Sequence, residues 1–266
     1  MADLAERART LLALHTAPEI LILANVWDVE SARVVAATPG VCALATASHS
    51  IAATFGYDDG EQIGFELHLD MVGRIVGTVD LPVTMDFEAG YGDAGETARR
   101  AISVGVVGGN LEDQLRPLDD AVTAVEAVLA AGRDAGIDFV LNARTDVFLH
   151  ADADRELLVA EAVRRGRAFL AAGAPVVFVP GVVDRAEIGA LVDGFGPGKL
   201  SLLAVPGASL PVRELQELGV ARVSTGPFTQ RVAMTALQDA TAALMAGGVL
   251  PPATRDPASP DRRPIG

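Results

Sequence analysis

Short apolar runs alternate with longer amphipathic segments along almost the whole chain. The apolar runs are nearly continuous, which is typical of strands buried on both faces of a parallel sheet. They fall at Ile20–Ala24, Cys42–Ala47, Val83–Phe87, Val106–Leu111, Phe139–Ala143, Val176–Val179, Leu200–Ala204 and Ala221–Ser224. The segments between them carry apolar residues at helical spacing, over 28–38, 62–78, 95–104, 119–135, 152–172, 184–193, 211–218 and 228–246. Eight strand–helix units in roughly 250 residues predict an α/β fold of the (β/α)8 TIM-barrel type, and an open doubly wound sheet is the alternative.

Both ends of the chain depart from this pattern. Residues 2–15 predict an additional leading helix, whereas residues 248–266 are rich in proline and predict a poorly ordered tail. Neither a linker nor a repeated segment interrupts the region between them. We therefore expect one barrel domain over residues 1–247, with the leading helix as part of it.

The net charge limits the classes of partner that we expect, and the cysteine content bears on disulfides and on location. The 266 residues carry a net charge of −14, which argues against nucleic acid or an anionic membrane surface as a partner. A pocket with its own arginine and metal ion still accepts a small anionic metabolite. No apolar run approaches the ~20 residues of a membrane-spanning helix. The single cysteine, Cys42, excludes an intrachain disulfide, fits a cytoplasmic location and is expected to be a small buried residue within its strand.

Polar side chains gather at the carboxyl ends of the first five predicted strands, where barrel enzymes carry their catalytic groups. They are Asn25, Asp28, Thr46, Ser48, His49, Asp86, Glu88, Asn110, Glu112, Asp113, Asn142, Arg144 and Asp146. Acids, amides and one arginine at five successive strand ends are hard to explain by packing alone. We therefore expect a functional site at this end of the barrel.

Asp86 and Glu88 are the strongest candidates within this set. Positions two apart on a strand point to the same side, so both carboxylates address one spot. A divalent cation relieves their repulsion and their cost of desolvation, and Mg²⁺ prefers such hard oxygen ligands. A solvated pair of loop acids is the alternative. Of the acids after the fourth strand, Glu112 has the same parity as Asn110 and is expected to face the barrel axis.

Arg144 is the candidate that would bind an anion. It leaves a strand end pointing inward, where its planar guanidinium can hold a carboxylate with two hydrogen bonds. A structural ion pair with Glu112 or Asp146 is the alternative. His49 is a candidate acid or base, although a packed or surface histidine fits its position equally well.

Five motifs, in order through residues 20–230, resemble the isocitrate lyase/phosphoenolpyruvate mutase superfamily. They are Asn25-Val-Trp-Asp28-Val-Glu-Ser-Ala32, Thr46-Ala-Ser-His-Ser-Ile-Ala-Ala53 with Gly56-Tyr-Asp-Asp-Gly60, Asp86-Phe-Glu-Ala-Gly-Tyr-Gly92, Gly109-Asn-Leu-Glu-Asp-Gln114 and Asn142-Ala-Arg-Thr-Asp146. The resemblance implies a barrel whose last helix, here about 228–246, is swapped with a partner subunit. It implies dimers that pair into a tetramer, so we expect a homo-oligomer.

The resemblance also implies a role for each candidate. The position of Asp86 would hold Mg²⁺, or alternatively Mn²⁺, with Asp59, Glu88 and Glu112 assisting, partly through water. The substrate would contact Thr46, Ala47, Ser48, Asp59, Asn142 and Arg144. The catalytic residues are expected to be Thr46, Ser48, Glu112 and Arg144. The substrates implied are small 2-oxo or 2-hydroxy di- and tricarboxylates, or phosphonopyruvate.

The chain departs from the family pattern after the fourth strand. Family lyases carry Lys-Lys-Cys-Gly-His on a mobile loop there, whereas this chain runs from Glu112 through Asp-Gln-Leu-Arg-Pro almost directly into the next helix. The loop has no cysteine, so the lyase mechanism that uses a thiol as acid or base is not expected. The phosphonomutase asparagine of that loop is missing, and Val179-Pro180-Gly181 stands where mutases place a histidine.

These observations predict a Mg²⁺-dependent carbon–carbon lyase or decarboxylase that acts on a small 2-oxo or 2-hydroxy carboxylic acid. Chelation of a 2-oxo carboxylate by the metal stabilises an enolate, and loss of CO2 from an oxaloacetate-like acid requires no base. The first alternative is a phosphonomutase or a phosphonopyruvate hydrolase. The second is a protein that binds 2-oxo acids without turnover.

Overall fold

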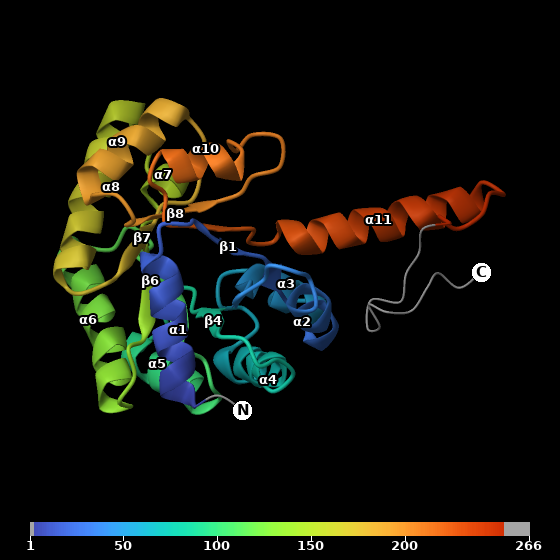
Figure 1. Ribbon diagram of the computed structural model, residues 1–266, viewed down its shortest axis with the longest axis horizontal. Coiled ribbons are helices and arrows are strands. Elements are labelled where there is room, and N and C mark those ends of the chain that lie inside the picture. Colours follow the sequence, from blue (N-terminus) through green and yellow to red (C-terminus); the bar gives the residue numbers. More distant parts are fainter. Residues whose placement is uncertain (1–2, 253–266) are drawn as a thin grey trace.

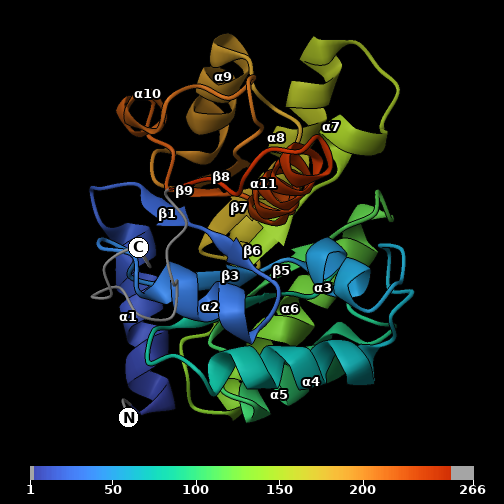
Figure 2. The ribbon, with the colours of Figure 1, turned by 90° about the vertical axis from the view of Figure 1, so that its right-hand side faces the viewer.

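The computed structural model describes residues 3–252, and they form a nearly closed parallel barrel surrounded by helices (Figures 1 and 2). The sheet has nine strands in the order β1-β9-β8-β7-β6-β5-β4-β3-β2. β1 (Leu21–Leu23) pairs with β9 (Arg222–Ser224), and β2 (Asn25–Val26) pairs with β3 (Leu44–Thr46). β1 and β2 are therefore two halves of the first predicted strand, and together they join the two edges of the sheet.

The side chain of Asn25 accounts for the division of that strand. Its Oδ1 accepts the backbone N–H groups of Thr225 at 2.9 Å and Gly226 at 2.8 Å. Its Nδ2 donates to the carbonyl oxygen of Thr46 at 2.7 Å. One buried amide thus satisfies backbone groups on both edges of the sheet, which must otherwise be paired by a regular strand.

The remaining strands confirm the predicted barrel. They are β4 (Val83–Asp86), β5 (Gly108–Glu112), β6 (Val140–Arg144), β7 (Val176–Phe178) and β8 (Leu200–Leu203). All neighbours are parallel, so every strand delivers its carboxyl end to the same end of the barrel. Residues 3–252 do not form the open doubly wound sheet that was the alternative.

Helices follow the strands as the apolar spacing predicts. They are α1 (Leu4–Thr16), α2 (Val29–Ala36), α4 (Phe65–Val76), α5 (Ala94–Ser103), α6 (Leu118–Asp134), α8 (Arg155–Ala171), α9 (Arg185–Phe195), α10 (Val212–Glu217) and α11 (Phe228–Met245). Two short helices, α3 (Ser48–Thr54) and α7 (Val147–His150), were not predicted. Each spans two turns or fewer, too short for a helical period to show in the sequence.

The barrel interior changes from apolar to polar along its axis. At the amino-terminal end, Leu11 of α1 packs so close to Gly108 that a Cβ atom there would lie 2.8 Å from Leu11 Cδ2. Further along, Asn142 Nδ2 donates to Asn110 Oδ1 at 2.8 Å, and both side chains are buried. The leading helix therefore closes one end, and an amide layer lies between it and the carboxyl ends of the strands.

Cys42 corrects one expectation. It lies ahead of β3, is exposed, and contacts the carbonyl oxygen of Gly40. The prediction of a buried residue was wrong because the strand begins only at Leu44.

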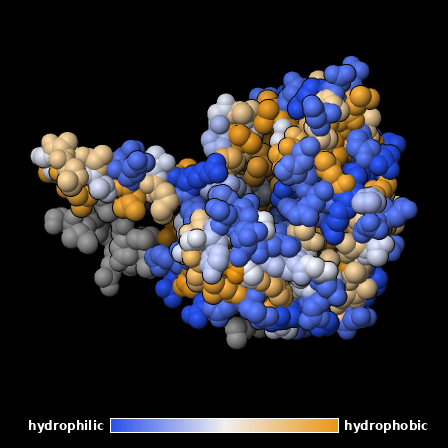
Figure 3. Space-filling view, turned by 180° about the vertical axis from the view of Figure 1, so that it is seen from behind, coloured by the Kyte–Doolittle hydropathy of each residue, from blue (hydrophilic) through white to orange (hydrophobic). Residues whose placement is uncertain are grey.

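α11 points away from the barrel (Figure 1). None of its residues is buried. The apolar residues Val232, Met234 and Leu237 have 67%, 49% and 61% of their surface exposed. Figure 3 shows hydrophobic side chains along this projecting arm.

Among residues 3–252, no helix combines the length and apolar character that a bilayer crossing needs. The cytoplasmic location stays a prediction. Most of the predicted tail, residues 253–266, lies outside the described residues.

Candidate functional site

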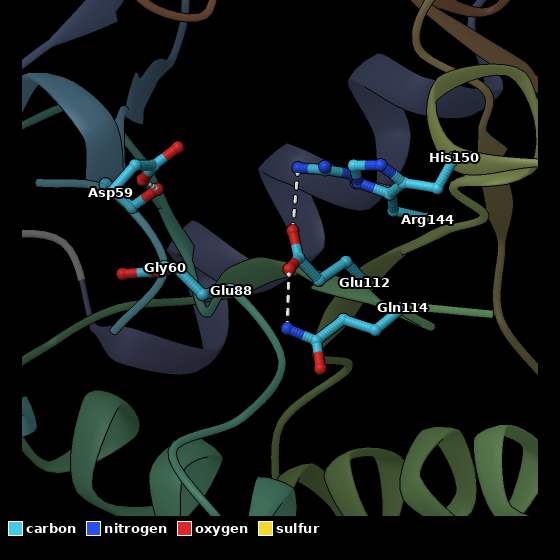
Figure 4. Close-up of a pocket in the computed structure, with 8 residues that line it drawn as sticks. Asp59, Gly60, Glu88, Glu112, Gln114, Arg144 and His150 are labelled. Carbon is cyan, nitrogen blue, oxygen red and sulfur yellow. Dashed lines mark hydrogen bonds and ion pairs between the residues drawn. The ribbon is translucent and has the colours of Figure 1, made fainter. Parts of the chain in front are cut away.

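A polar cavity of about 460 Å³ lies at the carboxyl ends of the strands (Figure 4). It is lined by Ser48, Asp59, Gly60, Glu88, Glu112, Gln114, Arg144 and His150. Asp59, from the connection between α3 and α4, and Glu88, which follows β4, stand on one side in Figure 4. Glu112, Gln114, Arg144 and His150 stand on the other. Five residues singled out from the sequence thus meet in one cavity although they lie up to 96 positions apart, from Ser48 to Arg144.

Ser48 connects two of the predicted metal ligands. Its Oγ–H donates to Asp86 Oδ2 at 2.8 Å and lies 3.4 Å from Asp59 Oδ1. Its backbone N–H donates to the same Asp86 oxygen at 3.3 Å. The backbone N–H of Asp86 in turn donates to Thr46 Oγ1 at 3.1 Å. Thr46 is fully buried, so in this structure it positions the Asp86 backbone beneath the cavity.

Glu88 ties the loop that carries Asp59 to the turn after β4. Its Oε1 accepts the hydroxyl of Tyr91 at 2.7 Å, and its Oε2 accepts the backbone N–H of Glu61. Glu61 Oε1 accepts the backbone N–H of Tyr91 at 2.7 Å. The turn demands Gly90, because a Cβ atom at its φ of +100° would lie 2.9 Å from Ala94. These bonds hold Glu88 and the Asp59 loop in one arrangement.

Arg144 forms ion pairs with two acids, Glu112 and Asp146. Its Nη1 lies 2.9 Å from Glu112 Oε2, and its Nε donates to Asp146 Oδ1 at 2.6 Å. Glu112 Oε1 also accepts Gln114 Nε2–H at 3.2 Å. The structural ion pair considered as an alternative is therefore present, and the same guanidinium still lines the cavity. The acids orient Arg144 without removing it from reach of a ligand.

Asp113, which follows Glu112, has a structural role. Its Oδ1 accepts the backbone N–H groups of Leu115 at 3.1 Å and Asp146 at 3.0 Å. Its Oδ2 lies 3.1 Å from Arg165 Nη1, and both side chains are buried. Asp113 thereby locks together the loops that carry Glu112 and Arg144.

The acids of the cavity are incompletely compensated. Burial raises the pKa of Glu88 to about 7, the Tyr91 hydroxyl lowers it, and the charges of Asp86 and Asp59 raise it further. Burial raises the pKa of Glu112 to about 7 against the lowering effect of Arg144, with Asp146 and Asp86 adding to the rise. A bound cation would relieve this accumulated negative charge.

The donor set fits Mg²⁺ held largely through water. Within residues 3–252, no three His, Cys, Asp or Glu side chains lie close enough together to ligate one ion. Mg²⁺ commonly keeps several waters and takes only one or two carboxylates plus oxygens of the substrate. Asp86, with Asp59 joined to it through Ser48, supplies oxygen donors of that kind. Glu88 and Glu112 would then act from further away, and their ligand roles stay predictions.

Other predicted contacts lie deeper than expected. Asn142 is fully buried and bonded to Asn110, and Ala47, also buried, immediately precedes α3. Gln114, His150 and Gly60 line the cavity but were not predicted. Gln114 sits in a left-handed conformation, with φ of +45°, and His150 ends the unpredicted helix α7. Neither feature carries a sequence signal.

The connection after β5 is as short as its sequence indicates. Only residues 113–117 separate β5 from α6, and none of them is a cysteine. The single cysteine of the chain, Cys42, stands before β3, at the opposite end of the barrel. No thiol of this chain can therefore serve the cavity as an acid or a base.

The chain is similar to several known proteins in sequence and in fold. Residues 11–245 match the profile of a family described as phosphoenolpyruvate phosphomutase. An oxaloacetate decarboxylase of Paraburkholderia xenovorans is 28% identical over 258 residues, which cover 90% of this chain and 82% of that protein. A crystal structure from Burkholderia cenocepacia J2315, provisionally named a phosphonomutase, is 40% identical with a TM-score of 0.84, covering 92% of this chain and 100% of that one.

Oxaloacetate acetylhydrolase in complex with its product oxalate is 25% identical with a TM-score of 0.83, covering 97% of this chain and 92% of that one. These relatives thus include an oxaloacetate decarboxylase, an oxaloacetate acetylhydrolase and a protein provisionally named a phosphonomutase. The match over residues 11–245 spans most of the chain. The chain therefore belongs to the phosphoenolpyruvate phosphomutase family, within the isocitrate lyase/phosphoenolpyruvate mutase superfamily.

Proposed function

We propose that this protein is a Mg²⁺-dependent carbon–carbon lyase, and specifically a decarboxylase of a small 2-oxo dicarboxylic acid. The observation that carries the proposal is the cavity of about 460 Å³, in which uncompensated acids beside Asp86 face the guanidinium of Arg144. A metal-chelating 2-oxo carboxylate with a further carboxylate complements both sides of such a cavity.

The chain's own residues hold and orient the substrate. Arg144 binds a carboxylate of the substrate, and Glu112 and Asp146 fix the plane of the guanidinium. Ser48 presents a backbone N–H and a hydroxyl beside Asp86, where they can stabilise developing negative charge on the 2-oxo group. Bound at Asp86, Mg²⁺ would supply Lewis acidity toward the 2-oxo carboxylate.

The reaction needs little more from the protein. The bond between C3 and C4 breaks, its electron pair moves into the 2-oxo system to give an enolate, and CO2 leaves. A proton then adds to C3. The short β5–α6 connection without a thiol supports this reaction over cleavages that need a cysteine as acid or base. The likeness to an oxaloacetate decarboxylase supports it as well.

Carbon–phosphorus chemistry is the second candidate. It is supported by the 40% identity to the Burkholderia structure provisionally named a phosphonomutase. Phosphonopyruvate has a 2-oxo carboxylate and a distal dianion, so the same cavity would take it.

Product analysis separates the candidates. Purified protein with Mg²⁺ would be given oxaloacetate, 2-hydroxy diacids of similar size and phosphonopyruvate, with carbon and phosphorus NMR as readouts. Oxaloacetate loses CO2 with free Mg²⁺ alone, so the Asp86→Ala variant at equal Mg²⁺ sets the background. Pyruvate above that background supports the proposal. Phosphate or phosphoenolpyruvate from phosphonopyruvate alone favours the second candidate, and Mg²⁺-dependent oxalate binding without any product favours a binding protein.

We also propose that α11 packs against a second copy of the chain, as a swapped helix of a homo-oligomer. Its exposed apolar residues Val232, Leu237 and Met245 support this, because an isolated surface helix normally buries its apolar face. A further apolar surface lies beside its base, lined by Val205, Pro206 and Phe228 among others. A partner helix would cover such surfaces.

A further inference from the structure

Arg222 crosses the interior of the barrel. It extends from β9, is fully buried, and donates from Nη2 to Asn110 Oδ1 on β5 at 3.2 Å. Its Nε and Nη1 are buried and have no hydrogen-bond partner among the described residues. A buried charge without a partner is costly. The single hydrogen bond to Asn110 therefore does not explain why the Arg222 guanidinium is buried there.

Within residues 3–252, no acid forms an ion pair with Arg222, and on the amino-terminal side of the barrel it faces a histidine. His15 of α1 lies there, with Nδ1 bonded to the carbonyl oxygen of Leu11 at 2.8 Å and with Nε2 unpartnered within the described residues. Burial, followed by the charge of Arg222, lowers the pKa of His15 to about 3, so the ring is neutral. Ser201, the register partner of Arg222 on β8, contributes only a hydroxyl.

The acids that can balance Arg222 stand on the cavity side. Asp86 pairs in register with Asn110, the residue to which Arg222 is bonded. Burial lowers the pKa of Arg222 to about 9, and the charge of Asp86 raises it, so the side chain is protonated at neutral pH. One amide therefore separates the buried cation from the residue proposed to hold the metal.

Arg165 shows what a fully paired buried arginine looks like in the same molecule. It is also buried, yet it contacts Asp113 at 3.1 Å and Glu161 at 2.8 Å. In the part of the chain that the structure describes, Arg222 has no such acid partner, so its charge acts on its surroundings at longer range.

The cavity needs additional positive charge to bind an anion. Asp59, Asp86, Glu88 and Glu112, when ionised, outnumber Arg144 even after the two charges of a divalent cation are added. An anionic substrate would be repelled by that excess. We infer that Arg222 is a positioning residue that acts through Asn110: its buried charge offsets the acids from beneath and lets the cavity accept a dianionic 2-oxo acid.

This inference rests on the proposed function but is tested by binding alone. Calorimetry would measure the affinity of Mg²⁺ by itself, and of oxalate at saturating Mg²⁺, for wild type, Arg222→Met and Arg222→Lys. Loss of the charge should make Mg²⁺ bind several-fold more tightly and oxalate about tenfold more weakly. Lysine should restore both affinities to within about threefold of wild type.

Arg7→Met is the matched control. Arg7 is a buried arginine of α1 whose Nε is unpartnered within the described residues, and its ion pair is with the exposed Asp80. This variant should leave both affinities unchanged. If Arg222→Met does not fold, Asn110→Asp tests the same idea, because a carboxylate there still accepts from Arg222 and Asn142 while cancelling the charge.

Opposite shifts of the two affinities support the inference, because a purely structural defect does not strengthen Mg²⁺ binding. Unchanged affinities in a folded variant, or a parallel loss of both, overturn it. If the variants show the expected pattern of oxalate binding although the protein turns over no substrate, that result refutes the proposed function and supports the inference. A wild-type protein that binds neither probe overturns both.

Discussion

Ser48 Oγ lies 2.8 Å from Asp86 Oδ2, although the two residues come from different strand ends and are 38 positions apart. The same oxygen of Asp86 also accepts the backbone N–H of Ser48. The hydroxyl and the carboxylate are thus fixed relative to one another before any ligand arrives, which reduces the ordering cost of binding.

Replacement of Asp86 by alanine should abolish Mg²⁺-dependent oxalate binding and leave the fold intact. The carboxylate is the proposed metal ligand, and its removal also relieves repulsion with Glu88. Calorimetry with oxalate and thermal unfolding would measure the two effects. Asp70→Ala, which removes an exposed acid paired with Arg74 on α4, should leave binding unchanged. Retained binding in the Asp86 variant would place the metal elsewhere.

Arg144→Lys should weaken oxalate binding by about tenfold or more, even though the charge is kept. An ammonium group cannot reproduce the planar arrangement in which Nε bonds Asp146 and Nη1 faces Glu112. Titration with oxalate at saturating Mg²⁺ measures the change. Arg164→Lys on the surface of α8 should have no effect. Equal affinity of wild type and the Arg144 variant would mean that the arginine is structural only.

Stability should fall in mild acid because of His15. Burial lowers the folded-state pKa of His15 to about 3, below the 6.5 of an exposed histidine. The unfolded chain therefore takes up a proton first as the pH drops below 6.5, and stability is lost from there down to about pH 3. Between pH 8 and pH 5.5 this group should cost about 1.4 kcal/mol.

Urea unfolding at the two pH values would measure the contribution of His15. His15→Gln cannot titrate, so its free energy of unfolding should fall by about 1.4 kcal/mol less than that of wild type over the same interval. Identical pH dependence in both proteins would show that the histidine is not held neutral.

Leu237→Asp together with Met234→Asp should convert the proposed oligomer to a smaller species. Both residues lie on α11 with 61% and 49% of their surface exposed. Charged side chains would make burial against a second copy costly. Light scattering coupled to size exclusion gives the mass. Gln238→Glu on the same helix is the control, and a wild-type monomer would refute the packing of α11.

Gly108→Ala should destabilise the barrel by about 1–3 kcal/mol. The new Cβ would lie 2.7 Å from the carbonyl oxygen of Val140 and 2.8 Å from Leu11, so α1 must shift. Gly189→Ala in α9 meets nothing within 4 Å and should be neutral or slightly stabilising. Urea unfolding compares them, and an unchanged Gly108 variant would show that α1 is not closely packed.

Local signals were sufficient for the eight strands, for the helices other than α3 and α7, and for five of the eight residues that line the cavity. Buried parallel strands are short apolar runs, so all eight could be located from the sequence. Locating the strands also located the polar residues at their carboxyl ends. Glu112 was correctly placed toward the axis because side chains alternate along a strand. The start of the second strand was misjudged at Cys42, because an apolar run does not mark the residue at which pairing begins.

The sequence by itself determined a parallel barrel with acids, amides and an arginine at one end, since periodicity and residue chemistry are local properties. Only the tertiary structure decided how those groups share their charges. It divides Arg144 between Glu112 and Asp146, bonds Glu88 to the backbone of Glu61, and sends Arg222 across the barrel to a residue 112 positions away. Such contacts depend on strand register and closure, and these are set by the packing of the whole barrel.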